Sequence, residues 1–205
     1  GSMVSPAIPG YVPELDERLP YDPEKAKALL AEAGYPDGFS FSLLCDNDVY
    51  VNEEEICQAV SAMWARIGLK ASLDVAPTSL QTVKFESGKF DVGILGWANE
   101  PMIDSYSILS QVAHSKTGTF GVFNWGGWKY PEVDTLIETA SEELDREKRL
   151  ALQAKALLAL NKEVAFMPLH HLCDTGVPRR SHGPPDFVMR ILARSGMTSP
   201  ADGNV

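Results

Sequence analysis

The 205-residue sequence has no uncharged apolar run of the roughly 18 residues that a membrane-spanning helix requires. It also has only three cysteines, Cys45, Cys57 and Cys173, which are too few and too scattered for a disulfide scaffold, and the sequence does not decide whether any two of them pair. Basic residues are scarce, since 18 Lys and Arg stand against 28 Asp and Glu, for a net charge of −10. Such a charge repels a phosphate backbone, so we expect no nucleic acid partner.

Local signatures of catalysis are missing as well. The sequence contains no G-x-S-x-G and no H-E-x-x-H motif, and the segment around Lys89 lacks the first glycine and the Ser or Thr of a phosphate-binding loop. His170, His171 and Cys173 are metal-ligand types, but adjacent residues of a strand point to opposite faces and do not share one ion. We therefore expect no enzyme, no bound metal and no cofactor.

What the sequence does have is the composition of a folded domain. Apolar residues make up 44% and charged residues 22% of the chain, and a chain of this length can bury about 70% of its surface. Residues 4–20 hold four prolines without hydrophobic periodicity, which predicts an extended lead-in. Gly1-Ser2-Met3 is typical of an expression scar.

From residue 21 onward the hydrophobic pattern alternates between the helical and the strand period. Asp22-Pro23 predicts the start of a short amphipathic helix that stops at Gly34, and Asn52 with Glu55 predicts a capping box for the second helix. This alternation favours an α/β fold, a mixed sheet flanked by helices. Helices are expected at about 23–33, 53–67 and 78–87, and strands at 39–45, 69–75 and 90–97.

Residues 98–130 lose all periodicity and are rich in glycine and aromatic residues. A loop of this length inside a compact domain usually serves a binding surface. Two helices are expected after it, at 131–144 and 146–163, the second capped by Asp145. A strand at 166–172 follows, and Pro168 confines that strand to an edge or a strand start. The last apolar stretch is 187–193.

Trp97, Asn99, Glu100 and Asp104 lie at and just after the carboxyl end of the expected strand 90–97. In open α/β sheets ligands collect at this end of the strands. Aromatic faces with carboxylates suit a ligand that carries an ammonium group, through ion pairing and cation-π attraction. On composition alone, a core tryptophan beside solvated loop acids is the simpler interpretation.

Several segments resemble one known family in the same order. The stretch from Tyr21 to Tyr35 resembles the Y-D-P-E-K-A-K-x-L-L-x-E-A-G segment of the extracellular solute-binding proteins of peptide-type ABC importers, the dipeptide, oligopeptide and nickel-binding group. The further matches are Trp64 to Lys70 with W-x-x-I-G, Gly88 to Asp91 with G-x-[FYH]-D, Gly96-Trp97 with the G-W before the ligand-side loop, Asn124 to Ile137 with N-x-x-x-Y-x-N-P-E-x-D-x-L-I, and Met167 to Leu169 with I-P-L.

The resemblance covers about residues 20–172, and members of this family are longer and fold as two lobes around a cleft. It implies that residues 21–175 form the C-terminal lobe, that residues 176–205 return toward a first lobe or form a tail, and that residues 1–20 lead in from a missing N-terminal lobe. It further implies capture of a short peptide or related small solute between the lobes, in the periplasm or at the cell surface, and delivery to membrane permease subunits.

The resemblance also suggests residue roles. In the family's peptide binders an acid a few residues after G-W meets the ligand's ammonium group, and by spacing its counterpart is Glu100, with Asp104 as the second candidate. Trp97 would form a cleft wall, and Asn124 and Trp125 are weaker candidates. Because the family's usual A-D-Y-x-D-P is replaced by the sequence from Ala98 to Asp104, a metal chelate, a sugar or an opine stays open as ligand. An enzyme or interaction module that uses this lobe is a further alternative.

Overall fold

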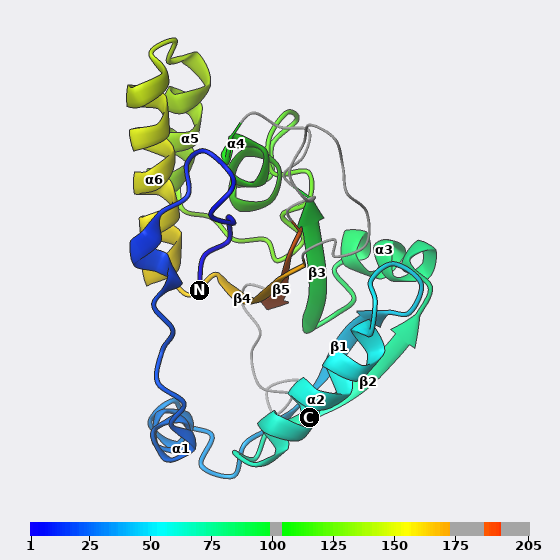
Figure 1. Cartoon of the computed structure of the whole chain (residues 1–205). Helices are drawn as coiled ribbons and strands as arrows, with labels where there is room; N and C mark the ends of the chain where they lie inside the picture. Colours follow the sequence, from blue (N-terminus) through cyan, green and yellow to red (C-terminus); the bar gives the residue numbers. More distant parts are fainter. Residues whose placement is uncertain (99–103, 173–186, 194–205) are drawn as a thin grey trace. The chain divides into compact units, whose positions relative to one another are not determined.

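The computed structural model describes residues 1–98, 104–172 and 187–193 (Figure 1). The chain divides into two compact units. One unit holds Leu19–Ile94 with Ala193, and the other holds Gly1–Arg18 with the described part of Leu95–Leu192. Among the described residues, no helix combines the length and the apolar character needed to cross a bilayer.

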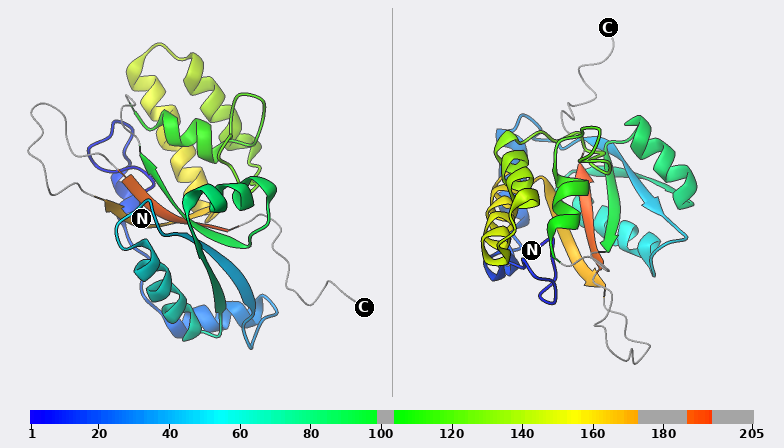
Figure 2. Two further views of the ribbon diagram at one scale, coloured as in Figure 1. Left: turned by 90° about the vertical axis from the view of Figure 1, so that its right-hand side faces the viewer. Right: turned by 90° about the horizontal axis from the view of Figure 1, so that it is seen from above.

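The unit that holds Leu19–Ile94 is built on parallel strands. β1 (Ser40–Asp46) lies between β2 (Lys70–Ala76) and β3 (Val92–Ala98) and is parallel to both, with Leu43 opposite Leu73 on one side and Val92 on the other. α2 (Glu53–Ala65) lies over β1 and β2 (Figures 1 and 2). The remaining helices of this unit are α1 (Pro23–Glu32) and α3 (Thr78–Ser87).

The helix ends of this unit test the capping predictions. At α1 the Asp22 carboxylate accepts the Lys25 N–H at 2.9 Å, and Gly34 has a φ of +93°, so both predicted ends are confirmed. The apolar side of α1 has no buried residue, and Leu29 is 54% exposed. At α2 the predicted capping box is wrong. Asn52 takes a left-handed φ of 60° and its side chain makes no cap hydrogen bond, because the chain turns sharply there.

A disulfide between Cys45 and Cys57 joins β1 to α2. Both cysteines are buried, and their Cα atoms lie 6.5 Å apart. One end of the same interface is filled by Trp64 of α2, whose ring meets Phe41 of β1 edge to face at 5.3 Å. The pairing, which the sequence left open, thus places a covalent link inside the apolar layer between strand and helix.

The other unit contains the antiparallel part of the sheet. Beyond β3 the strand order continues with β5 (Phe187–Ala193) and then β4 (Phe166–Leu172), which is antiparallel to β5 and forms an edge. Pro168 sits on this edge strand beside an irregularity at Pro168/His170, as predicted. Parallel and antiparallel pairs together confirm the mixed α/β sheet that the sequence predicts.

Two long helices, α5 (Pro131–Glu142) and α6 (Arg146–Lys162), lie side by side in this unit (Figures 1 and 2). The predicted cap of α6 is confirmed, since the Asp145 carboxylate accepts the N–H groups of Glu147 and Lys148 at 3.0 and 3.1 Å. Residues 98–130, expected to be irregular, contain the short helix α4 (Tyr106–Ile108) and a π-helical turn, η2 (Leu109–Ala113). The side chains that this unit buries completely or nearly so include Ile108, Leu109, Ile137, Leu157 and Leu160.

The N-terminal segment differs from the extended lead-in that the prolines predict. Residues 1–18 belong to the same unit as α5 and α6, and they form a short 3-10 helix, η1 (Pro13–Asp16). The prolines mark turns, and the apolar residues between them face inward. The two compact units meet in sequence near residues 18 and 94. The buried apolar side chains of this segment are Met3, Val4, Ile8, Val12 and Leu15.

We expect the Cys45–Cys57 disulfide to stabilise the folded chain by about 2 to 4 kcal/mol, because it restricts the unfolded chain. Urea unfolding of the oxidised chain, of the chain reduced with dithiothreitol and of Cys57→Ala measures this difference. Cys173→Ala is the matched control, since it leaves the bond intact. Thiol titration of the unreduced chain in denaturant should find one free thiol among the three cysteines, and three free thiols would contradict the pairing.

Candidate functional site

Aromatic side chains gather at the carboxyl end of β3. The ring of Trp97 meets Phe123 edge to face at 5.2 Å, and Phe123 meets Trp125 in the same manner at 5.5 Å. Trp97 and Trp125 are half-buried, and Phe123 is 37% exposed. Trp97, Phe123 and Trp125, here called the aromatic cluster, therefore present ring surface at the sheet edge where ligands collect in α/β proteins. Of the predicted site residues, the structure brings Trp97 and Trp125 together.

Asp104, predicted as the second candidate to bind an ammonium group, is committed to contacts within the protein. Its side chain is buried and forms an ion pair with Arg149 of α6. The other carboxylate oxygen, Oδ1, accepts the Tyr106 N–H at 3.0 Å. Both oxygens of Asp104 are thus engaged, and the arginine already supplies its positive partner.

Ser105 fixes the same point of the chain. Its hydroxyl donates to Oε1 of the fully buried Gln153 at 2.7 Å, and its N–H donates to the Pro9 carbonyl at 2.9 Å. Asp104 and Ser105 together therefore join α6 and the N-terminal segment to the chain that follows β3.

Asn124, a weaker candidate for ligand binding, holds a turn together. Its side chain is 3% exposed, and its Nδ2 donates to the carbonyls of His114 and Trp128 at 2.9 and 2.8 Å. Its Oδ1 accepts the Trp128 N–H at 3.2 Å. Both the nitrogen and the oxygen of the Asn124 amide are therefore hydrogen-bonded to the backbone of the loop that carries Phe123 and Trp125.

His114 is a buried polar residue that the sequence analysis did not single out. It is 1% exposed, its Nε2 lies 3.2 Å from Glu138 Oε1, and its Nδ1 lies 2.7 Å from the Ser115 carbonyl. Its ring stacks on Phe120 at 4.5 Å. No sequence signal marks this residue, because its acidic neighbour lies on α5, 24 residues away. It anchors the glycine-rich loop to that helix.

Asn99 and Glu100 lie outside the described residues, as does Cys173. Within the described part of the chain, no group of three or more His, Cys, Asp and Glu is placed to hold a metal ion. Of the four predicted site residues that lie in the described part of the chain, Asp104 and Asn124 are buried, whereas Trp97 and Trp125 are half-buried.

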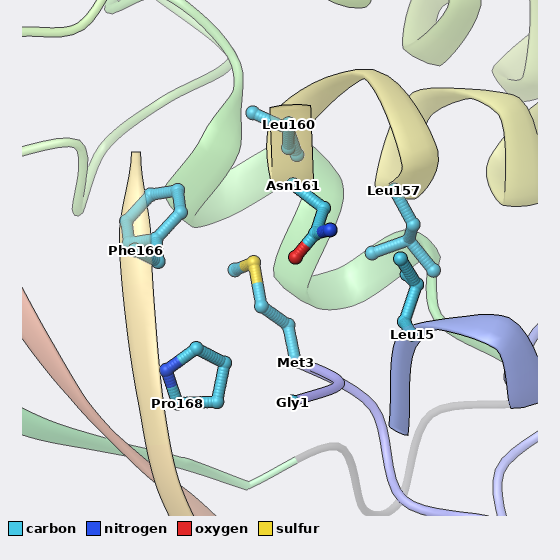
Figure 3. Close-up of a pocket in the computed structure, with 8 residues that line it drawn as sticks. All are labelled: Gly1, Met3, Leu15, Leu157, Leu160, Asn161, Phe166 and Pro168. Atoms are coloured by element: carbon cyan, nitrogen blue, oxygen red, sulfur yellow. The ribbon is translucent and has the colours of Figure 1, made fainter. Parts of the chain in front are cut away.

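A small apolar pocket lies between the N-terminal segment, α6 and β4 (Figure 3). In Figure 3 the Met3 side chain extends between Phe166 and Leu157, with Asn161 directed toward it. The pocket has a volume of about 10 Å³, which is room for a single water. It is too small for a peptide or another solute, so the aromatic cluster is the better candidate site.

Comparison with known proteins identifies the family. A family model described as bacterial extracellular solute-binding proteins, family 5, middle region, matches residues 1–120. The chain belongs to this family. Family 5 is made of binding proteins rather than enzymes, and its members are periplasmic or extracellular.

Relatives in this family are longer than the chain. Heme-binding protein A of Haemophilus influenzae is 30% identical over 169 residues, which are 81% of this chain and 30% of the relative. The dipeptide-binding protein of Escherichia coli is 26% identical over 175 residues, which are 83% of this chain and 32% of the relative. The chain thus spans about a third of the length of these curated relatives.

A solved structure supports the fold. The ABC transporter-associated periplasmic binding protein DppA of Helicobacter pylori, in complex with the peptide STSA, superimposes with a TM-score of 0.69 at 21% identity. The match covers 94% of this chain and 35% of that protein. This match confirms the α/β fold predicted from the sequence. The predicted membership in family 5 is confirmed by the family model and by the relative from Haemophilus influenzae.

We expect Asn124→Ala to lower the free energy of unfolding by about 1 to 3 kcal/mol, because it removes the buried hydrogen bond to the His114 carbonyl and both hydrogen bonds to the backbone of Trp128. Asn124→Asp should be at least as damaging, since it places acceptor atoms against both carbonyls. Urea unfolding monitored by tryptophan fluorescence measures the loss. Asn47→Ala, at an exposed position, serves as the control. Equal stability of Asn124→Ala and the parent would show that the hydrogen bonds of the Asn124 side chain do not stabilise this loop.

Proposed function

We propose that the chain is the C-terminal lobe of a solute-binding protein that captures short peptides between two lobes and delivers them to the permease subunits of an ABC importer. Membership in family 5 supports this function, and the aromatic cluster at the carboxyl end of β3 is the single observation that carries the site. Closure of the two lobes around the ligand would need the first lobe of the same protein, since the relatives are about three times as long as this chain.

Within this proposal, Glu100 is the residue that meets the peptide's ammonium group. Two acids, Glu100 and Asp104, follow Trp97 closely in the sequence, and the negative charge of Asp104 is already balanced by Arg149. Glu100 is therefore the better candidate of the two. Trp97 and Trp125 would contribute a wall through their half-exposed rings, and cation-π attraction would add to the ion pair.

A metal chelate is the second candidate ligand, with a sugar or an opine less directly supported. One relative is named a heme-binding protein, and it shares 30% of its residues with this chain over the matched region. Aromatic rings such as those of the aromatic cluster also suit stacking on a flat macrocycle. This ligand would not need Glu100 as an ammonium anchor, which distinguishes the two candidates.

The proposed location is the periplasm or the cell surface. Disulfides form and persist in such oxidising compartments and are rare in the cytosol. The buried Cys45–Cys57 disulfide agrees with export.

Native mass spectrometry of the full-length protein, purified from its own host, tests the ligand class. Co-purified masses that differ by amino-acid residues would identify a peptide carrier. A single mass with a heme spectrum, or another non-peptide adduct, would keep the transport role and replace the peptide by the second candidate.

We expect Glu100→Ala in the full-length protein to weaken peptide binding by about 1 to 3 kcal/mol, because the ligand ammonium group would lose its proposed charged partner. Isothermal titration calorimetry with a peptide recovered from the native protein measures the change. Glu132→Ala, which removes an exposed acid at the start of α5, is the control and should bind as the parent does. Unchanged affinity of Glu100→Ala would exclude the anchor role.

A further inference from the structure

The unit that holds Leu19–Ile94 buries two carboxyl groups at one corner. Asp46, at the end of β1, is 5% exposed, and Glu53, at the start of α2, is 1% exposed. Glu53 Oε1 accepts the Asp46 N–H at 3.1 Å, and Asp46 Oδ2 accepts the Thr78 hydroxyl at 3.1 Å. The other two oxygens, Asp46 Oδ1 and Glu53 Oε2, are buried without a hydrogen-bond partner. Each acid therefore has one satisfied and one unsatisfied oxygen.

No described cation compensates this carboxyl pair, since neither acid forms an ion pair with a residue in the described part of the chain. Asp48, in the loop before α2, adds another negative charge while it accepts the Thr78 N–H at 2.8 Å.

The helix on the other side of β1 does not supply a positive charge either. From α3, Gln81 donates its amide to the Cys45 carbonyl at 3.1 Å, and Gln81 and Thr78 are both uncharged. Lys84 of α3 is paired with Asp74 of β2 at 2.6 Å. Within the described part of the chain, none of these neighbours therefore brings an unpaired positive side chain to the corner.

Burying an ionised carboxylate without a positive partner is costly, and such groups usually become neutral instead. Burial, together with the negative charges of Asp46 and Asp48, raises the pKa of Glu53 to about 7. The backbone N–H groups of Asp46 and Tyr50 act in the opposite direction and lower it. Burial also raises the pKa of Asp46. A proton fits the unpartnered oxygens better than a hydrated ion, because these atoms have no contact with solvent.

We propose that Asp46 and Glu53 hold one proton as a pair at neutral pH, and that release of this proton loosens the junction of β1 with α2. The pair would make this corner a pH-sensitive contact, independent of ligand and of the proposed transport function. The same two elements are joined by the Cys45–Cys57 disulfide, which limits how far the junction can open.

The direction of the pH effect follows from proton linkage. A glutamate with the ordinary pKa of 4.5 loses its proton in the unfolded chain well before Glu53 does in the folded chain. The stabilising contribution of Glu53 is therefore complete below pH 4.5 and is lost as the pH rises through 7. Between pH 5 and pH 8 this group should raise the unfolding equilibrium constant by about 10- to 100-fold.

Urea unfolding of the chain at several pH values between 5 and 8 tests the proposal. Glu53→Gln keeps an acceptor for the Asp46 N–H but cannot ionise, so its stability should fall much less with rising pH than that of the parent. Glu55→Gln, on the exposed side of the same helical turn, removes an equal charge and should retain the parent's pH dependence. The same pH dependence in Glu53→Gln and the parent would overturn the proposal.

A site-specific titration tests the pair without requiring Glu53→Gln to fold. The side-chain carboxyl ¹³C resonance of Glu53, followed by NMR in the labelled parent chain, should titrate near pH 7. Asp46→Asn removes the neighbouring charge and should lower this midpoint. A midpoint near the ordinary value of glutamate in the parent, or a midpoint that Asp46→Asn leaves unchanged, would show that the two acids do not share a proton.

Discussion

The contacts of Asp104 and Ser105 hold together three segments that are distant in sequence. Asp104 pairs with Arg149 of α6, 45 residues away, and Ser105 reaches Gln153 of the same helix and the Pro9 carbonyl. Because Asp104, Ser105 and Gln153 are buried, each broken contact would leave a polar group unsatisfied, at a cost of about 1 to 3 kcal/mol. From Asp104 onward, the chain is therefore fixed to α6 and to the N-terminal segment.

This constraint bears on the proposed ligand site. Trp97 is held by β3 and by Phe123, and Asp104 is held by α6, so the fold fixes the position of the proposed aromatic wall and of the acid that pairs with Arg149. The hydrogen bond from the Ser105 N–H to the Pro9 carbonyl also holds the N-terminal segment against the rest of its unit. A Cβ at Gly10 would lie 2.3 Å from Ser105 Oγ, so only glycine allows this approach.

The sequence predicts regular elements well where the information is local. Asp22 and Asp145 cap their helices as expected, and the strands shift from their expected ends by at most about two residues. The errors arise where distant contacts decide. The apolar residues 1–18 are buried by the unit formed from residues after 94, and the helical turn at Tyr106–Ala113 is stabilised by burial of Ile108, Leu109 and Val112 rather than by its own propensity. The hydrophobic periodicity of a short segment cannot reveal burial by residues that are distant in the sequence.

Site residues are harder to predict than elements, because the chemistry of an acid depends on its partner. Asp46, Glu100 and Asp104 all lie in sequence at or shortly after the carboxyl end of a strand, which is where ligand-binding acids are expected. Asp104 has an arginine partner that no sequence spacing indicates, whereas the N–H of Asp46 donates to the carboxylate of another buried acid, Glu53. An acid paired with arginine stays charged and structural, and an acid paired with an acid favours a proton. Only an acid with neither partner keeps a charge to offer to a ligand, and the ion pair with Arg149 therefore argues against Asp104 as the proposed ammonium anchor.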